Sequence, residues 1–187
     1  MRPLPLIPFA CAAMLAATAC CAEAAPDAQF VPAFQSFLRA SEGQDAALAS
    51  ALAGFEALSR AEPASPVLLA YRGAATAMQA RSTYLPWRKM AYAEDGLALI
   101  DKALAMLQPA HDAPGQQQVP AVLDVKLVAA NTFLALPTMM NRRDRGVKLL
   151  GEVARSPLLP SAPPAFQETV RKALDKARLA PDGRPRT

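Results

Sequence analysis

The sequence predicts an all-α protein of about seven helices, arranged as antiparallel helix-turn-helix pairs. Three observations support this fold class. The hydrophobic fraction is 52% although only 6% of residues are aromatic, and alanine supplies 42 of the 187 residues, so the apolar content is mostly small and helix-favouring. Prolines divide the chain into windows long enough for three or more helical turns. Within the windows apolar residues recur at the helical period, without strand alternation.

The first 24 residues have the features of an export signal. Arg2 gives a positive start, Leu4 to Ala19 carries no charge, and Ala22-Glu23-Ala24 fits the small-x-small rule for cleavage before Ala25. The alternative is a lipoprotein signal ending at Cys20, which would then be acylated. We expect a periplasmic or secreted protein in the first case and a membrane-anchored lipoprotein of the bacterial cell envelope in the second. Cleavage before Ala25 would also remove all three cysteines, so packing must supply the stability.

Proline positions predict where the helices lie, because proline breaks the hydrogen-bond ladder of a helix interior. The proline-free windows are 33–62, which splits at 41–44, then 67–85, 87–108, 121–136, 138–156 and 165–180. Ser65-Pro66 predicts an N-cap followed by a first helical position. Asn141 with Asp144 predicts another helix start. The polar stretch 109–119 is predicted to be a loop.

One spacing recurs along the chain: a small residue, a larger apolar one four positions on, and an apolar one three further on. The triplets are Ala51, Phe55 and Leu58; Gly96, Ile100 and Ala103; and Gly146, Leu150 and Val153. The small position lets a neighbouring helix approach closely, and the other two fill the groove beside it. Each triplet therefore predicts a helix that packs antiparallel against the preceding one.

With Pro63 and Gly73, the first triplet matches the relative spacings of the tetratricopeptide repeat family, which the chain resembles over about residues 30–160. The repeats are degenerate, because the second unit is about 11 residues longer than the family's 34-residue unit. The resemblance implies an α solenoid over residues 25–180 with a C-terminal capping helix, followed by a disordered tail at 181–187. A compact, irregular helical bundle is the alternative fold.

The resemblance implies a noncatalytic adaptor or scaffold that binds another exported or membrane protein. The stretch from Tyr71 to Tyr92 holds every tyrosine and the only tryptophan, interleaved with basic residues. Aromatic and basic side chains dominate many protein interfaces. The partner-binding candidates are therefore Tyr71, Arg72, Tyr84, Trp87, Arg88, Lys89 and Tyr92. The alternative is that Tyr84 and Trp87 pack the extended turn against the body.

The inventory of reactive side chains is small. His111 is the only histidine and lies in the polar loop, Glu94 and Asp95 are adjacent on a helix, and Met139 with Met140 is more typical of packing than of a soft-metal site. We therefore expect no enzyme activity, cofactor, metal or small-molecule substrate. A helical enzyme using Glu94, Asp95 or His111 is the rival function.

Charge is unevenly distributed. Residues 25–140 carry eight basic and ten acidic side chains, a net charge of −2, whereas residues 141–187 carry eleven and five, a net charge of +6. An exported protein does not meet nucleic acid, so we expect none as a partner. The basic C-terminal third either contacts an anionic membrane surface or is a solvated face of the last helices.

Overall fold

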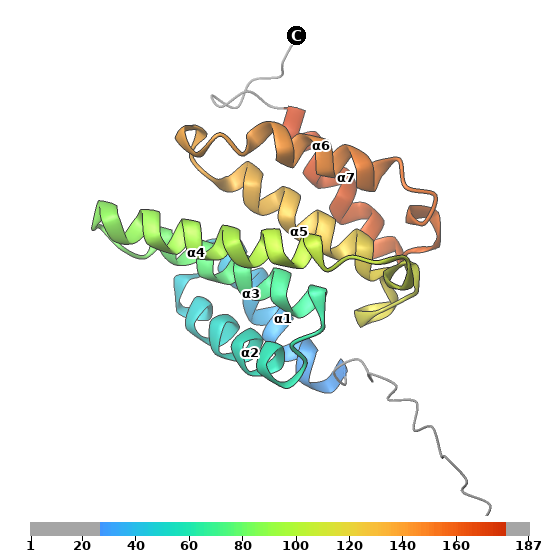
Figure 1. The fold of residues 1–187 in the computed structure, drawn as a ribbon, viewed down its shortest axis with the longest axis horizontal. Helices are drawn as coiled ribbons and strands as arrows, with labels where there is room; N and C mark the ends of the chain where they lie inside the picture. Colours follow the sequence, from blue (N-terminus) through green and yellow to red (C-terminus); the bar gives the residue numbers. More distant parts are fainter. Residues whose placement is uncertain (1–26, 179–187) are drawn as a thin grey trace, which may run out of the picture.

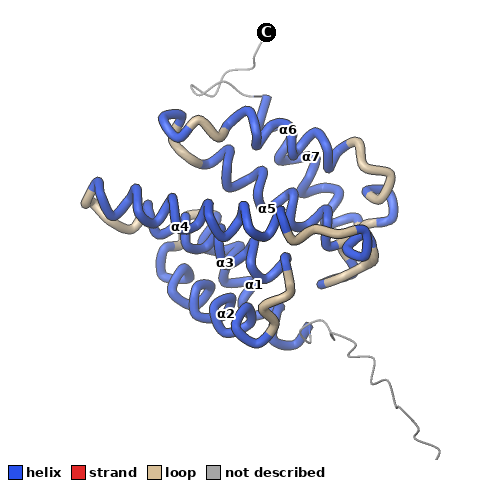
Figure 2. The backbone as a smooth tube through the Cα atoms, viewed as in Figure 1, coloured by secondary structure: helices blue, strands red, loops and turns tan. Residues whose placement is uncertain are grey.

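The computed structural model describes residues 27–178, and every regular element in that range is helical (Figures 1 and 2). The seven α-helices are α1 (Asp27–Ser41), α2 (Leu48–Ala61), α3 (Pro66–Met78), α4 (Pro86–Ala105), α5 (Ala121–Ala135), α6 (Arg143–Ala154) and α7 (Pro164–Arg178). The predicted all-α class and helix number are therefore confirmed for these residues. The predicted export signal, Cys20 and the tail at 181–187 lie outside the described residues.

The helices pack in sequential pairs. The most extensive contacts join α1 with α2, α3 with α4, and α5 with α6. All nine residues of the three triplets are buried, on α2, α4 and α6. In addition, α1, α3, α5 and α7 contact one another in succession, and α2, α4 and α6 each contact the helix that follows, α3, α5 and α7 respectively. The apolar faces predicted from the sequence are thus buried between neighbouring helices, where they form the core.

Glycine permits the closest approach between helices. A Cβ atom on Gly96 of α4 would lie 2.6 Å from both the Ala77 nitrogen and the Gly73 oxygen of α3. A Cβ on Gly146 of α6 would lie 3.1 Å from the Ala130 oxygen of α5. A real Cβ does not fit at 2.6 Å from backbone atoms, so Gly96 is limited to the smallest residue, whereas a Cβ at position 146 would require α5 to shift by a few tenths of an ångström.

Helix α1 begins before Pro32, so the expectation that proline excludes the preceding residues from this helix is wrong. Pro32 is the sixth residue of α1, and its missing amide hydrogen removes one ladder bond near the helix start. The preceding turn carries Phe30, which is 1% exposed and lies 5.6 Å from Tyr71, ring centre to ring centre. Burial of this ring in the aromatic core favours the helical turn before the proline.

The two predicted helix starts have different outcomes. Ser65 caps α3 as expected, because its hydroxyl accepts the Leu68 amide at 3.5 Å and Pro66 follows at the first helical position. Asn141 is not the cap of α6, which begins at Arg143. Instead, Asn141 ends the short 3-10 helix η5 (Thr138–Met140) with a positive φ of 51°. Asparagine tolerates this left-handed conformation better than most residues, which explains its use at this turn.

The predicted loop after α4 is tightly folded. It contains the 3-10 helices η3 (Pro109–Asp112) and η4 (Gln116–Gln118), and the Gly115 amide donates to the Val119 carbonyl at 2.8 Å. Between residues 27 and 178, we find no helix with an apolar stretch long enough to cross a bilayer.

Candidate functional site

Tyr71 lies in the core rather than on a binding surface. It is 5% exposed, its ring stacks on Phe55 with a centroid distance of 5.0 Å, and its hydroxyl donates a 2.8 Å hydrogen bond to Asp124 Oδ1 on α5. The neighbouring Arg72 is directed toward α2, where it donates to the Ser59 hydroxyl at 3.4 Å and lies 3.9 Å from the Glu56 carboxylate. These two candidates therefore join helices to one another.

Asp124 is a buried carboxyl that sequence reasoning did not single out. Burial raises its pKa from 3.8 to about 6, and the hydrogen bond from Tyr71 opposes that rise. The pKa of Tyr71 is also raised, first by burial and then by the negative charge of Asp124. Asp124 is the only acidic residue of α5 and lies between the apolar Leu123 and Val125. A single carboxyl in an apolar helix segment is the sequence feature that could have indicated a buried, hydrogen-bonded aspartate.

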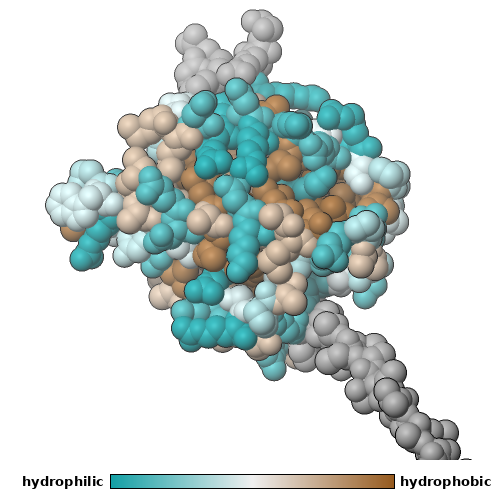
Figure 3. All heavy atoms as spheres, viewed as in Figure 1, coloured by the Kyte–Doolittle hydropathy of each residue, from teal (hydrophilic) through white to brown (hydrophobic). Residues whose placement is uncertain are grey.

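The start of α4 projects from the body of the protein. Helix α4 has 20 residues whereas its partner α3 has 13, so the first turns of α4 extend past the end of α3 (Figure 1). Residues 84–91 are all exposed, and the first buried residue of α4 is Ala93. We call residues 84–91 the α4 tip. In the space-filling view the α4 tip stands clear of the surrounding surface (Figure 3).

The α4 tip carries four of the seven partner-binding candidates. Tyr84 is 97% exposed and Trp87 is 68% exposed, so the alternative in which both rings pack against the body is wrong. Arg88 and Lys89 are also exposed, and neither has an ion-pair partner among the described residues. Tyr92 is half-buried at the base of the tip. The structure thus separates this group from Tyr71 and Arg72, although all lie within 22 residues of sequence.

A groove of about 490 Å³ follows the α4 tip along the same helix. We call it the methionine groove; it is lined by Met90, Glu94, Leu97, Ala98 and Asp101 of α4 and by Met139, Met140 and Arg142. Met139 is 79% exposed, so it does not pack as the sequence suggested, whereas Met140 is partly buried against the core. The groove therefore offers flexible apolar side chains to an incoming molecule.

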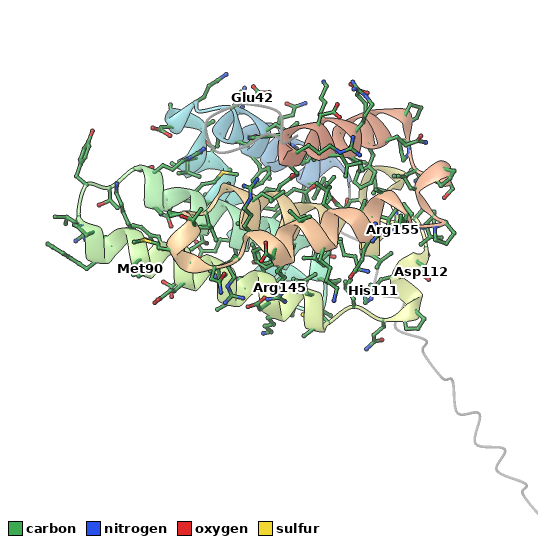
Figure 4. The ribbon with its side chains drawn as sticks, turned by 90° about the horizontal axis from the view of Figure 1, so that it is seen from above. Glu42, Met90, His111, Asp112, Arg145 and Arg155 are labelled. Atoms are coloured by element: carbon green, nitrogen blue, oxygen red, sulfur yellow. The ribbon has the colours of Figure 1, made fainter. Side chains whose placement is uncertain are left out.

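Charged residues close one end of the methionine groove. The Asp101 carboxylate accepts from Arg145 at 2.5 Å and lies 3.6 Å from Arg142 (Arg145 is labelled in Figure 4). The guanidinium carbon of Arg145 also lies 5.0 Å from the centre of the Phe133 ring. Glu94 lines the groove without an ion-pair partner among residues 27–178. The groove thus combines apolar walls with one available carboxylate.

His111 takes part in a local turn. The Nδ1 atom of His111 accepts the Gln108 amide at 2.8 Å and closes the η3 turn. A second hollow, of about 420 Å³, lies beside Asp112 and Arg155, at the end opposite Met90 (Figure 4). Its Lys126 ammonium is paired with Glu152 at 2.9 Å. Residues 27–178 contain no group of three or more histidine, cysteine, aspartate or glutamate side chains placed to hold a metal ion.

Internal ion pairs neutralise part of the basic C-terminal third. Arg171 lies 2.6 Å from Glu168 and 3.1 Å from Asp175, and its hydrogen bond lowers the pKa of Glu168. Arg142 and Arg145 share Asp101, as described above. Lys148 and Lys176 remain exposed.

Comparison with known proteins adds no assignment. Neither a protein-family model, nor a curated protein, nor a solved structure matches this chain.

Proposed function

We propose that the protein is a noncatalytic adaptor or scaffold of the bacterial cell envelope, and that its methionine groove binds a segment of another exported or membrane protein. The single observation that carries the proposal is the exposure of Met139 and Met90, at 79% and 39%, beside an open groove. Methionine side chains are flexible and polarisable, so they adapt to apolar partner surfaces and are frequent in protein-binding grooves.

The packing of the helices supports a tetratricopeptide-like array as the scaffold. In such an array each helix pair contacts only its neighbours, and a terminal helix covers the last apolar face. The contacts of α1, α3, α5 and α7 in succession follow this order, and Val170 and Ala173 of α7 are buried. We propose this solenoid arrangement on these grounds.

The groove indicates the chemistry of the partner segment. Its apolar walls favour two or three apolar side chains, and Glu94 favours a lysine or arginine beside them. At the other end, Asp101 is already paired with two arginines and adds little attraction for a further cation. The expected ligand is therefore a short, mainly apolar segment with one basic residue.

The location in the cell envelope rests on the sequence of residues 1–24. Export with cleavage before Ala25 gives a periplasmic or secreted protein, and acylation at Cys20 gives a lipoprotein. A mass spectrum of the mature amino terminus distinguishes a free Ala25 from a lipid-modified Cys20.

Site-specific photocrosslinking tests the groove. A photoreactive residue at position 139 should give a discrete crosslinked product in the native envelope, and Glu94→Gln should reduce its yield. The matched control places the same group at Val147, which is 45% exposed on α6 and does not line the groove. Equal products from positions 139 and 147 would contradict the proposal. Glu94 also lines the groove, so the rival enzyme is tested at its other two candidates: unchanged phenotype after alanine replacement of Asp95 and His111 would argue against it.

A further inference from the structure

The α4 tip presents apolar and aromatic side chains on a convex end. Tyr84, Leu85 and Trp87 are 97%, 38% and 68% exposed, and none of them lines either of the two hollows described above. The three side chains thus lie outside any concavity of the kind that holds a small-molecule ligand. Tyrosine and tryptophan rings are amphipathic, and they concentrate at the headgroup level of membranes.

The backbone of the tip is ordered, so the side chains are held in place. Pro86 occupies the first helical position of α4, and the Lys89 amide donates to the Leu85 carbonyl at 3.0 Å. The preceding connection is tied to α1, because Arg81 donates to the Ala40 carbonyl at 2.7 Å. Tyr84, Leu85 and Trp87 therefore lie at the ordered start of α4, the helix end that extends from the body of the protein (Figure 1).

Within the α4 tip itself the charge has one sign, and the first acidic residues of α4, Glu94 and Asp95, lie beyond it. Residues 79–93 contain three basic side chains, Arg81, Arg88 and Lys89, and no acidic one. Arg88 and Lys89 are exposed within two positions of Trp87, and no described carboxylate neutralises them. Exposed cations beside interfacial aromatic residues are complementary to a surface of lipid phosphates.

We propose that the α4 tip binds the surface of an anionic phospholipid bilayer, with Tyr84, Leu85 and Trp87 at headgroup depth and Arg88 and Lys89 beside the phosphates. The inference goes beyond the proposed function and uses residues outside the methionine groove. It also places that groove, which begins at Met90, next to the bilayer, where a segment of a membrane protein is accessible. A membrane contact through the basic C-terminal third stays the alternative, and the substitutions described below distinguish the two.

The sequence supplies its own reporter, because Trp87 is the only tryptophan. The expected mature chain, which begins at Ala25 and lacks the apolar signal, is mixed with vesicles of phosphatidylcholine containing about one third phosphatidylglycerol, or with phosphatidylcholine alone. With the anionic vesicles, Trp87 emission should move to shorter wavelength, and brominated acyl chains should quench it. Neutral vesicles should give a much smaller shift, and added salt should weaken binding to the anionic ones.

Two pairs of substitutions test the charge. Arg88→Gln with Lys89→Gln should weaken binding to the anionic vesicles by about 30-fold, since each cation near such a surface contributes roughly fivefold. Lys148→Gln with Lys176→Gln removes the same charge from two other exposed sites and should weaken binding by less than about threefold. Circular dichroism checks that all variants keep their helicity.

A relocated reporter tests the orientation. Trp87→Phe with Arg155→Trp keeps an aromatic ring at the tip and moves the tryptophan to the opposite end of the molecule, where Arg155 is labelled in Figure 4. Its emission should stay unquenched while the chain still sediments with the vesicles. If Trp87 stays unshifted although the chain sediments, another segment binds the lipid and the inference fails.

Two further results would also overturn the inference. One is weakening by the Lys148 and Lys176 pair that equals or exceeds the weakening by the Arg88 and Lys89 pair, because the α4 tip would then not be the preferred contact. The other is a blue shift of Trp87 that rises with protein concentration in the absence of lipid, which would assign the tip to a second copy of the chain. Since photocrosslinking at position 139 does not require lipid binding, the proposed function can stand or fall separately.

Discussion

Asp124 makes the stability of the fold depend on pH, in a direction opposite to that of a paired surface carboxylate. Its folded-state pKa is about 6, while an aspartate in an unfolded chain titrates near 3.9. The folded state therefore holds the Asp124 proton more tightly than the unfolded state does. Between about pH 4 and pH 6 the unfolded chain loses this proton more readily than the folded one, so the free energy of unfolding falls as pH rises. Above about pH 6 the contribution of Asp124 stays low.

The size of the effect follows from the two pKa values. They differ by about 2, and each unit corresponds to about 1.4 kcal/mol, so the full loss is about 3 kcal/mol. About 1 kcal/mol of it has occurred by roughly pH 4.5, because the unfolded aspartate is already mostly ionised there. Between roughly pH 4.5 and pH 7.5 the wild type should thus lose about 2 kcal/mol relative to Asp124→Asn, which cannot ionise.

Urea unfolding at a series of pH values, followed by far-ultraviolet circular dichroism, measures this difference. Trp87 is unsuitable as a probe of unfolding, because it is already 68% exposed in the folded state. Asp95→Asn is the matched control, since it removes one carboxylate from an exposed position on α4. If the difference between wild type and Asp124→Asn stays constant across this pH range, or changes in the opposite sense, the reasoning about burial is refuted.

Tyr71→Phe tests the other half of the pair. The phenylalanine ring fits the same aromatic cluster, but the Asp124 carboxylate loses its 2.8 Å hydrogen bond. The expected destabilisation is about 1–3 kcal/mol near pH 7.5, because hydrogen bonds to a charged group are at the strong end of the range. It should shrink at acidic pH, where the folded Asp124 is protonated. Tyr92→Phe, at a half-buried tyrosine, is the control.

The remaining predictions concern helix contacts. Gly96→Ala should lower the free energy of unfolding by about 1–3 kcal/mol, because its Cβ would meet the α3 backbone at 2.6 Å. Gly151→Ala should instead raise it by up to about 1 kcal/mol, since its Cβ meets only the flexible end of Arg155 and alanine favours the helix. Asp101→Asn should cost under about 1 kcal/mol, because its arginine pairs are partly solvent-exposed. Urea titration of each variant checks these values; a neutral Gly96→Ala would contradict the close approach.

The helices and their pairing could be predicted from sequence because both follow from apolar spacing. A residue such as Ile100 or Leu150 is 0–1% exposed since the triplet that contains it has only one face on which all members can be buried. Where a helix starts depends on the burial and backbone conformation of single residues, which apolar spacing does not predict. Pro32 is tolerated because Phe30 gains a buried site, and Asn141 is at a turn because it accepts a positive φ.

The candidate site could be predicted only in part. Tyr71 and Tyr84 are the same residue type in the same aromatic and basic stretch, yet one is 5% and the other 97% exposed. Their difference comes from the lengths of two helices: α3 ends at Met78, so the early turns of α4 extend past the end of α3. The buried contact between Tyr71 and Asp124 spans 53 positions, a separation that composition and periodicity do not encode.

The α4 tip contributes little to the stability of the fold. Burial of apolar surface is the main source of folding free energy, and residues 84–91 bury none of their side chains deeply. A protein with no use for this tip could shorten α4 to begin near Ala93 and keep every buried residue of the helix. The tip instead exposes a tryptophan and a tyrosine to water, which disfavours solubility without adding to the core. An external contact accounts for both features, and the lipid and groove experiments determine which contact it is.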